Sequence, residues 1–250
     1  MNPPNYHNWA VIIPQITTQV IAAARVNDAT VIIPGNVYNF GATPGVWSDL
    51  TPQRPNTHKG RIRVDMERAY RDAGVRTIVL RAGNFIDPDG DDDVMGMMIL
   101  RQIAKGRITD AGDADVMQAY CYLPDWARAA VSLSEKRAEL AVFEDVALGG
   151  HAFTVNELKA TLEAALGRDL RLVRFPWWVM TLFAPFWELA RELREMRYLW
   201  GTSHSLSDVK LRALLGDFEP TDMRSVMLAG LPRDIHPDQS VTRGATVAVT

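Results

Sequence analysis

Two short apolar runs constrain the fold most strongly, because each follows a longer stretch with helical periodicity. Residues 30–33 (Thr-Val-Ile-Ile) and 75–80 show no regular alternation of apolar and polar side chains, which is typical of strands buried on both faces of a parallel sheet. Residues 11–26 and 59–73 repeat apolar side chains at the spacing of one helix face. The order helix, strand, loop, helix, strand predicts an α/β fold with a doubly wound parallel sheet.

The second half of the chain predicts shorter elements. Pro124 stands in the first turn of one expected helix, and Thr154 to Glu157 has the spacing of a capping box that opens another, ending near Gly167. The Trp-rich stretch 176–199 predicts a helix that is interrupted at Pro185. The other expected elements are a loop at 41–57, a helix at 94–105, strands at 120–123 and 170–175, a last clear helix capped by Ser207, and a tail at 236–250.

Composition and charge narrow the class of protein. Of the 250 residues, 47% are hydrophobic and 23% are charged, an ordinary globular composition. The net charge of -3 gives no broad attraction to nucleic acid. The single cysteine, Cys121, suits a reducing compartment. No signal peptide is visible, and the most apolar segment, 175–186, is too short to span a membrane. We therefore expect a soluble, cytoplasmic protein without a nucleic-acid or membrane partner.

Five segments, in the same order along the chain, resemble the extended short-chain dehydrogenase/reductase family, which contains NAD(P)-dependent epimerases and dehydratases. Residues 34–39 (Pro-Gly-Asn-Val-Tyr-Asn) stand where the family has Ser-x-x-Val-Tyr-Gly, and 59–67 stand where it has Tyr-x-x-x-Lys-x-x-x-Glu. Residues 80–84 (Leu-Arg-Ala-Gly-Asn) resemble its Leu-Arg-x-x-Asn. Residues 120–127 resemble its Tyr-Val-x-Asp-x-Ala, and 207–220 resemble its C-terminal helix. Their joint order and spacing carry the resemblance.

The resemblance implies the domain organisation and the cofactor. Residues 1–86 would form the C-terminal part of a Rossmann-like NAD(P)-binding domain. Residues 87–235 would form a smaller α/β substrate-binding region, interleaved with the last sheet strands at about 118–150. The family holds the pyrophosphate of NAD or NADP on a Gly-x-x-Gly-x-x-Gly turn, and none of the 17 glycines forms that pattern. We therefore expect weak NAD(P) binding.

The missing turn also predicts a truncation. A partial doubly wound sheet would lack its first βα units, roughly 60 to 80 residues by the usual size of such units. The strand at 30–33 would then have an unpaired edge, which favours a homodimer or a higher oligomer.

The family's catalytic side chains are replaced in this sequence. Anchored on Glu67, the family's tyrosine falls on Lys59 and its lysine on Arg63. Anchored on Val37 and Tyr38, its serine falls on Pro34. Arginine stays protonated and proline has no side-chain donor, so Lys59 and Tyr38 are the catalytic candidates of an impaired or inactive site. The resemblance further places the cofactor beside Pro34, Gly35, Arg63, Ala82 and Gly83, and the small-molecule substrate beside Asn84.

Each candidate has a plainer interpretation. Lys59 and Arg63 are one helical turn apart and also fit a solvated basic face. Tyr38 also fits packing at a strand end, and Asn84 fits a turn. We predict no metal site, because the aspartates at 87–93 lack the EF-hand spacing and the histidines are scattered. The tryptophans at 177, 178, 187 and 200 are assigned to the core or to a dimer surface rather than to a membrane-facing patch.

The sequence thus predicts an NAD(P)-dependent epimerase/dehydratase-like oxidoreductase that acts on an unidentified small molecule. The alternative is a non-catalytic protein that senses a dinucleotide or binds a partner on the same fold, since a fold does not fix a function. A truncated product without function is the third possibility.

Overall fold

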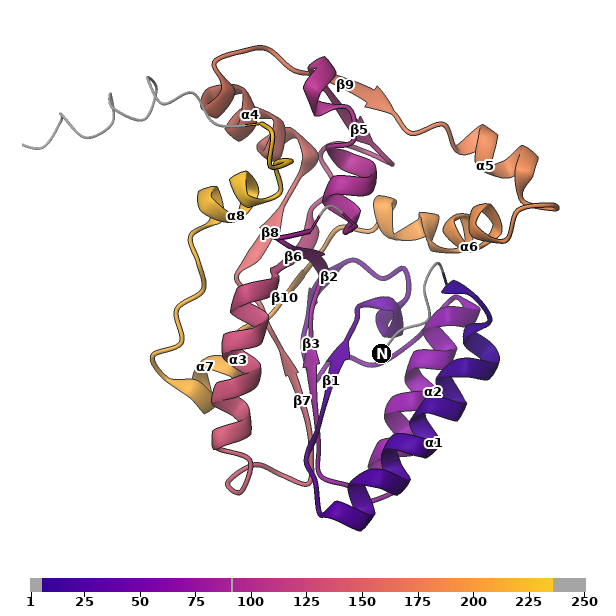
Figure 1. The fold of residues 1–250 in the computed structure, drawn as a ribbon, viewed down its shortest axis with the longest axis vertical. Helices are drawn as coiled ribbons and strands as arrows, with labels where there is room; N and C mark the ends of the chain where they lie inside the picture. Colours follow the sequence, from indigo (N-terminus) through magenta and orange to yellow (C-terminus); the bar gives the residue numbers. More distant parts are fainter. Residues whose placement is uncertain (1–5, 91, 236–250) are drawn as a thin grey trace, which may run out of the picture.

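The computed structural model describes residues 6–90 and 92–235. The main sheet has three parallel strands in the order β1 (Val31–Gly35), β3 (Thr77–Arg81) and β7 (Phe143–Ala147). Figure 1 shows α1 (Trp9–Asn27) and α2 (His58–Asp72) on one face of this sheet, with α3 (Leu123–Glu135) and α7 (Val209–Leu215) on the other. The predicted α/β class with a parallel sheet is therefore confirmed. The predicted tail and Asp91 lie outside the described residues.

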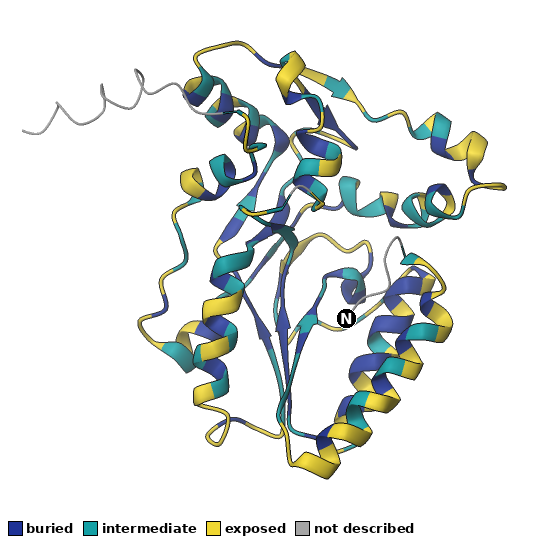
Figure 2. Cartoon of the chain, in the orientation of Figure 1, coloured by how far each residue is buried: buried dark blue, intermediate teal, exposed yellow. Residues whose placement is uncertain are grey.

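The central strand β3 explains why both faces of the sheet need a cover. All five of its residues are buried, and successive side chains point to opposite faces. Val79 packs in the cluster of Trp9, Ile13 and Met66 from α1 and α2. Ile78 and Leu80 pack in the opposite cluster with Ala129 and Leu133 from α3. The absence of polar alternation in the sequence thus corresponds to a strand that is buried on both sides, as Figure 2 shows.

Two helices begin close to their predicted positions, each at a capping residue that directly precedes the helix. Thr57 caps α2 by accepting a hydrogen bond from the Gly60 amide at 3.1 Å. Thr154 and Glu157 form the predicted capping box of α4 (Val155–Leu166), which ends at Gly167. Both caps satisfy amide groups that the first helical turn leaves without a partner.

By length and composition alone, helix α1 is long and apolar enough to cross a membrane, a test that the core helix of a soluble protein also passes. Here it packs against α2 and contributes Trp9 and Ile13 to the core.

A smaller α/β region surrounds the carboxyl end of the main sheet. In it, β6 (Gln118–Tyr122) lies between β4 (Asn84–Ile86) and β8 (His151–Phe153). Two further parallel pairs join β5 (Arg107–Asp110) to β9 (Arg171–Arg174) and β2 (Gly45–Trp47) to β10 (His204–Leu206). The other elements are η2 (Tyr38–Phe40), η3 (Met95–Ile99), η4 (Ile103–Lys105), α5 (Trp177–Phe183), α6 (Glu188–Met196), η5 (Arg197–Gly201) and α8 (Met223–Ala229).

Three expectations about elements were wrong. The expected helix at 94–105 is instead two short pieces, η3 and η4, separated by a turn. The loop at 41–57 contains β2, which forms only because β10, far away in the sequence, pairs with it. The helix after Ser207 is capped by Asp208 without a side-chain bond and is not the last, since α8 follows. Each error involves a partner or a turn that local periodicity does not encode.

Candidate functional site

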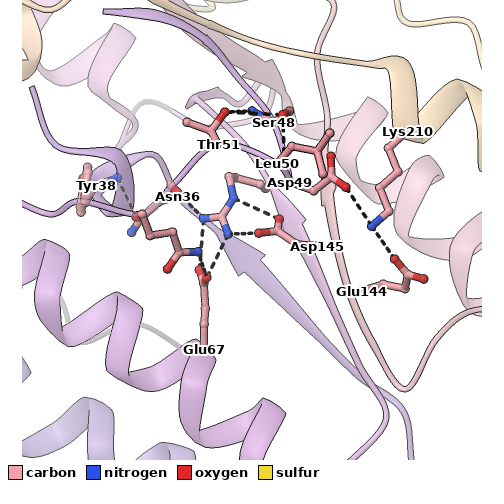
Figure 3. Close-up of polar contacts among 12 residues, drawn as sticks. Asn36, Tyr38, Ser48, Asp49, Leu50, Thr51, Glu67, Glu144, Asp145 and Lys210 are labelled. Atoms are coloured by element: carbon pink, nitrogen blue, oxygen red, sulfur yellow. Dashed lines mark hydrogen bonds and ion pairs between the residues drawn. The ribbon is translucent and has the colours of Figure 1, made fainter. Parts of the chain in front are cut away.

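A buried cation stands at the carboxyl end of β3. Arg81 has no exposed surface, and its guanidinium donates to Glu67 of α2 at 2.9 Å and to Asp145 of β7 at 2.6 Å. It also donates to the carbonyl of Asn36 at 2.7 Å. Burial lowers the pKa of Arg81, but Glu67 and Asp145 outweigh this and raise it. Figure 3 shows Glu67 and Asp145 converging from two elements, which ties α2, β1 and β7 together at this edge of the sheet.

Tyr38 lies at the same edge, just beyond β1. Its amide donates to the Asn36 side chain at 3.1 Å, and its hydroxyl lies 3.0 Å from the hydroxyl of Tyr6. Tyr38 and burial raise the pKa of Tyr6 well above its ordinary value. Sequence reasoning missed Tyr6, because nothing in its local pattern relates it to Tyr38. The two phenols form a half-buried polar pair over the N-terminal half of α2.

Lys59 is buried and engaged by α6. Its side chain is 2% exposed, and its ammonium donates to Glu195 at 2.5 Å and forms a second ion pair with Glu192. The Lys59 amide donates to the other oxygen of Glu195 at 3.0 Å. Burial raises the pKa of Glu195, but hydrogen bonds from Lys59 outweigh it and the pKa is lowered. Glu192 and Glu195 were not predicted, since only the fold brings them to α2.

Arg63 is buried one turn further along α2. Its guanidinium lies 4.5 Å from the centre of the Trp9 ring, a cation–π geometry. Burial lowers the pKa of Arg63, against the opposing effects of Tyr38 and Glu67. The interpretation of Lys59 and Arg63 as a solvated basic face is therefore wrong. The exposed arginines of α2 are Arg61, Arg68 and Arg71.

The residues expected beside the cofactor do not form a phosphate cradle. A Cβ on Gly35 would lie 2.6 Å from Val79, and one on Gly83 would lie 2.2 Å from the Ala119 carbonyl oxygen. These two glycines thus allow close backbone packing inside the protein. The Ala82 amide is used by Gly35, whose carbonyl accepts it at 2.9 Å. Gly35, Ala82 and Gly83 therefore do not form a cradle for the pyrophosphate of a dinucleotide.

Pro34 and Asn84 take part in strand pairing. Pro34 pairs in register with Leu80 within β1, the edge strand, and Asn84 pairs with Tyr120 at the start of β4. Because β1 and β3 are parallel, Tyr38 and Asn84 follow their strands at the same edge. Neither residue lines the cleft described next. Among residues 6–90 and 92–235, no group of three or more potential ligand side chains could hold a metal ion.

A cleft of about 890 Å³ opens at the N-terminal end of α2. The loop after β5 and the segment from the end of α6 through η5 form its other walls. Its lining residues are Asn56, Thr57, His58, Arg61, Ala111, Gly112, Asp113, Arg194, Glu195, Arg197, Tyr198, Trp200 and Gly201.

The cleft is mainly basic. Three arginines and one histidine face two carboxylates among these residues. Burial raises the pKa of Tyr198, with a smaller contribution from Tyr38. Lys59 does not line the cleft, but it holds Glu195 of the cleft wall through an ion pair.

Comparison with solved structures defines the fold. The chain matches no protein-family model and no curated protein. It is similar to a GalE-like L-threonine dehydrogenase from Cupriavidus necator (TM-score 0.70, 19% identity), covering 92% of this chain and 81% of that one. It is also similar to MoeE5 in complex with UDP-glucose and NAD (TM-score 0.67, 15% identity), covering 92% of this chain and 70% of that one.

A third similar structure is a UDP-glucuronic acid 4-epimerase from Bacillus cereus in complex with UDP-glucuronic acid and NAD (TM-score 0.68, 14% identity). The match covers 86% of this chain and 65% of the epimerase, so the chain spans about two thirds of that protein's length. The protein therefore has the fold of the extended short-chain dehydrogenases and epimerases, as the sequence predicted.

Proposed function

We propose that this chain forms the substrate-binding part of an NAD(P)-dependent epimerase/dehydratase-like oxidoreductase, and that the basic cleft binds a small anionic molecule. The observation that carries the proposal is the position of the cleft. It opens at the N-terminus of α2, and Lys59, where the resemblance puts the family's acid/base residue, pairs with Glu195 of its wall. Two of the similar structures contain UDP-sugars and NAD, so a nucleotide sugar is the substrate class that we propose.

The charges of the cleft favour an anion. The amides of the first turn of α2 and the helix dipole attract negative charge. Arg61, Arg194 and Arg197 are exposed, and none of the three forms an ion pair with a described residue. Arginine binds phosphate oxygens through two parallel hydrogen bonds. A diphosphate between these side chains and the end of α2 would occupy donors that now face solvent.

The proposal includes impaired turnover. The ammonium of Lys59 is a donor with no free lone pair, and Glu192 and Glu195 occupy it. Arg63 stacks on Trp9 and cannot exchange a proton at neutral pH. Bound NAD(P) would supply a hydride acceptor, but Gly35, Ala82 and Gly83 do not form a cradle for its phosphates. We therefore propose that Lys59 acts by positioning Glu195 in the cleft wall, and that Tyr38 acts through its contact with Tyr6 at the neighbouring sheet edge, rather than by exchanging protons with the substrate.

Calorimetric titration with UDP-glucose and UDP-glucuronic acid tests the ligand. We expect binding that Arg61→Ala and Arg194→Ala each weaken by about tenfold, because each removes a charge-assisted contact. Arg68→Ala, on the same helix but outside the cleft, is the matched control and should bind like the wild type. Absence of binding, or equal binding by all four proteins, would overturn the proposal.

A second titration, with NADH and NADPH followed by cofactor fluorescence, tests the cofactor separately. We expect weak binding or none by the 250-residue chain. Micromolar binding would show that residues other than Gly35, Arg63 and Gly83 hold the pyrophosphate.

A further inference from the structure

Five large apolar side chains are exposed together on α5 and the turn that leads into α6. Phe186 is 91% exposed and Trp178 is 71% exposed. Leu182, Phe183 and Trp187 are exposed beside them in the sequence. Figure 1 shows that this hairpin projects from the body of the molecule, and Figure 2 shows its tip as exposed. Of the two positions predicted for the tryptophans, the core or a dimer surface, this exposure excludes the core for Trp178 and Trp187. We call these five residues the apolar tip.

The arginines near the apolar tip in the sequence are exposed, whereas the glutamates are paired. Every arginine from β9 to η5 is exposed, namely Arg171, Arg174, Arg191, Arg194 and Arg197. The glutamates of α6 are partly buried and engaged: Glu188 with His7, and Glu192 and Glu195 with Lys59. Arg191 also pairs with Glu188 and Glu192, so the arginines without a carboxylate partner among the described residues are Arg171, Arg174, Arg194 and Arg197. The charge left at the surface is therefore mainly positive. Arg171 and Arg174 form no ion pair with any residue in 6–90 or 92–235.

We propose that the apolar tip and its arginines dock this protein on the surface of an anionic phospholipid bilayer. Tryptophan and phenylalanine partition into the boundary between headgroups and acyl chains, and arginines beside them bind the lipid phosphates. A projecting tip can enter that boundary without moving the sheet. A second copy of the chain would bring the same arginines face to face, and repulsion between these like charges disfavours that.

The geometry also places the bound membrane near the cleft. Helix α6 connects the two features, because it begins at the apolar tip and ends at Arg194 and Glu195 in the cleft wall. The docking surface nevertheless uses residues outside the cleft, since Arg171, Arg174, Trp178 and Phe186 do not line it. The two proposals can therefore fail independently.

Cosedimentation with two kinds of vesicle tests the docking. One kind is phosphatidylcholine alone, and the other contains about 30% phosphatidylglycerol, which gives it a negatively charged surface. We expect the full chain to sediment with the anionic vesicles and to be released by salt. The variant W178S/F186S should bind the vesicles at least about tenfold more weakly, because two large apolar side chains no longer enter the lipid. The variant R171E/R174E should lose the preference for anionic vesicles.

The matched control is V26S/L50S, which removes two apolar side chains that are equally exposed elsewhere and should sediment like the wild type. Circular dichroism and thermal melting establish that each variant is folded. Failure of the wild type to bind either vesicle would overturn the proposal, as would equal binding by W178S/F186S. A dimer that W178S/F186S abolishes, without any vesicle binding, would assign the tip to a second copy instead.

Discussion

The guanidinium of Arg81 and the carboxylate of Glu67 meet at 2.9 Å with both side chains almost fully buried, so the end of β3 is fixed to α2 by a charged contact. Asp145 holds the same guanidinium from β7 at 2.6 Å. Removing one partner from such a buried ion pair destabilises a protein, because it leaves a buried charge uncompensated. The relationship fixes the sheet edge at which Tyr38 lies.

Removal of one partner should therefore destabilise the protein. We expect Glu67→Gln to lower the free energy of unfolding by about 3 kcal/mol, because it leaves part of a buried charge uncompensated. Arg68→Ala breaks the exposed pair with Asp65 on the same helix and should cost less than about 1 kcal/mol. Urea unfolding of both variants measures the difference. Equal stability would show that water or Gln53, which donates to Glu67 at 2.8 Å, replaces the lost contact.

Gly83 should tolerate no side chain. A Cβ there would lie 2.2 Å from the carbonyl oxygen of Ala119, so Gly83→Ala must displace the backbone of β6. We expect a loss of about 1–3 kcal/mol, as for other overpacked sites. Gly201→Ala is the control, since no atom lies within 4 Å of its Cβ position. Thermal unfolding that is unchanged in Gly83→Ala would contradict the close approach of these two segments.

The stability should fall as the solution becomes mildly acidic. His204 is buried, stacks on Trp47 at 4.4 Å between ring centroids, and hydrogen-bonds the Thr202 carbonyl at 2.8 Å. Burial lowers the pKa of His204 below 6.5, and the Thr202 carbonyl opposes this in part.

A lowered folded-state pKa means that the unfolded chain binds the proton more readily. The contribution of neutral His204 is thus fully present above pH 6.5 and is lost as the pH falls through the folded-state pKa. We expect the Tm to decrease as the pH falls below about 6.5, and to decrease less in His204→Phe, which keeps a stacking ring but does not titrate. The same pH dependence in both proteins would assign the effect to another group.

Pro34 should limit self-association through β1. The Val31 amide and the Gly35 carbonyl bond to the β3 side, so by the alternation of a parallel ladder Ile32 and Pro34 face the open edge. Proline offers no amide there, which blunts the edge for pairing. We expect Pro34→Ala to increase the oligomeric fraction in analytical ultracentrifugation, and Pro34→Val to increase it further. A wild type that is already fully oligomeric, and unchanged in both variants, would mean that another surface drives association.

The sequence by itself determined the elements whose causes are local. The apolar spacing of 11–26 and 59–73 became α1 and α2, the runs at 30–33 and 75–80 became β1 and β3, and Thr154 with Glu157 became a capping box. Each depends on residues within a few positions of one another, which side-chain periodicity and capping chemistry can encode.

Only the tertiary structure decided what Lys59 contacts and which aromatic residues stay exposed. The carboxylates that hold Lys59 come from α6, more than a hundred positions along the chain. Trp178 and Trp47 are both apolar by sequence, yet Trp178 is 71% exposed and Trp47 is 2% exposed. Charge pairing and burial depend on which distant segments pack together, and the physical chemistry of one side chain does not specify that partner.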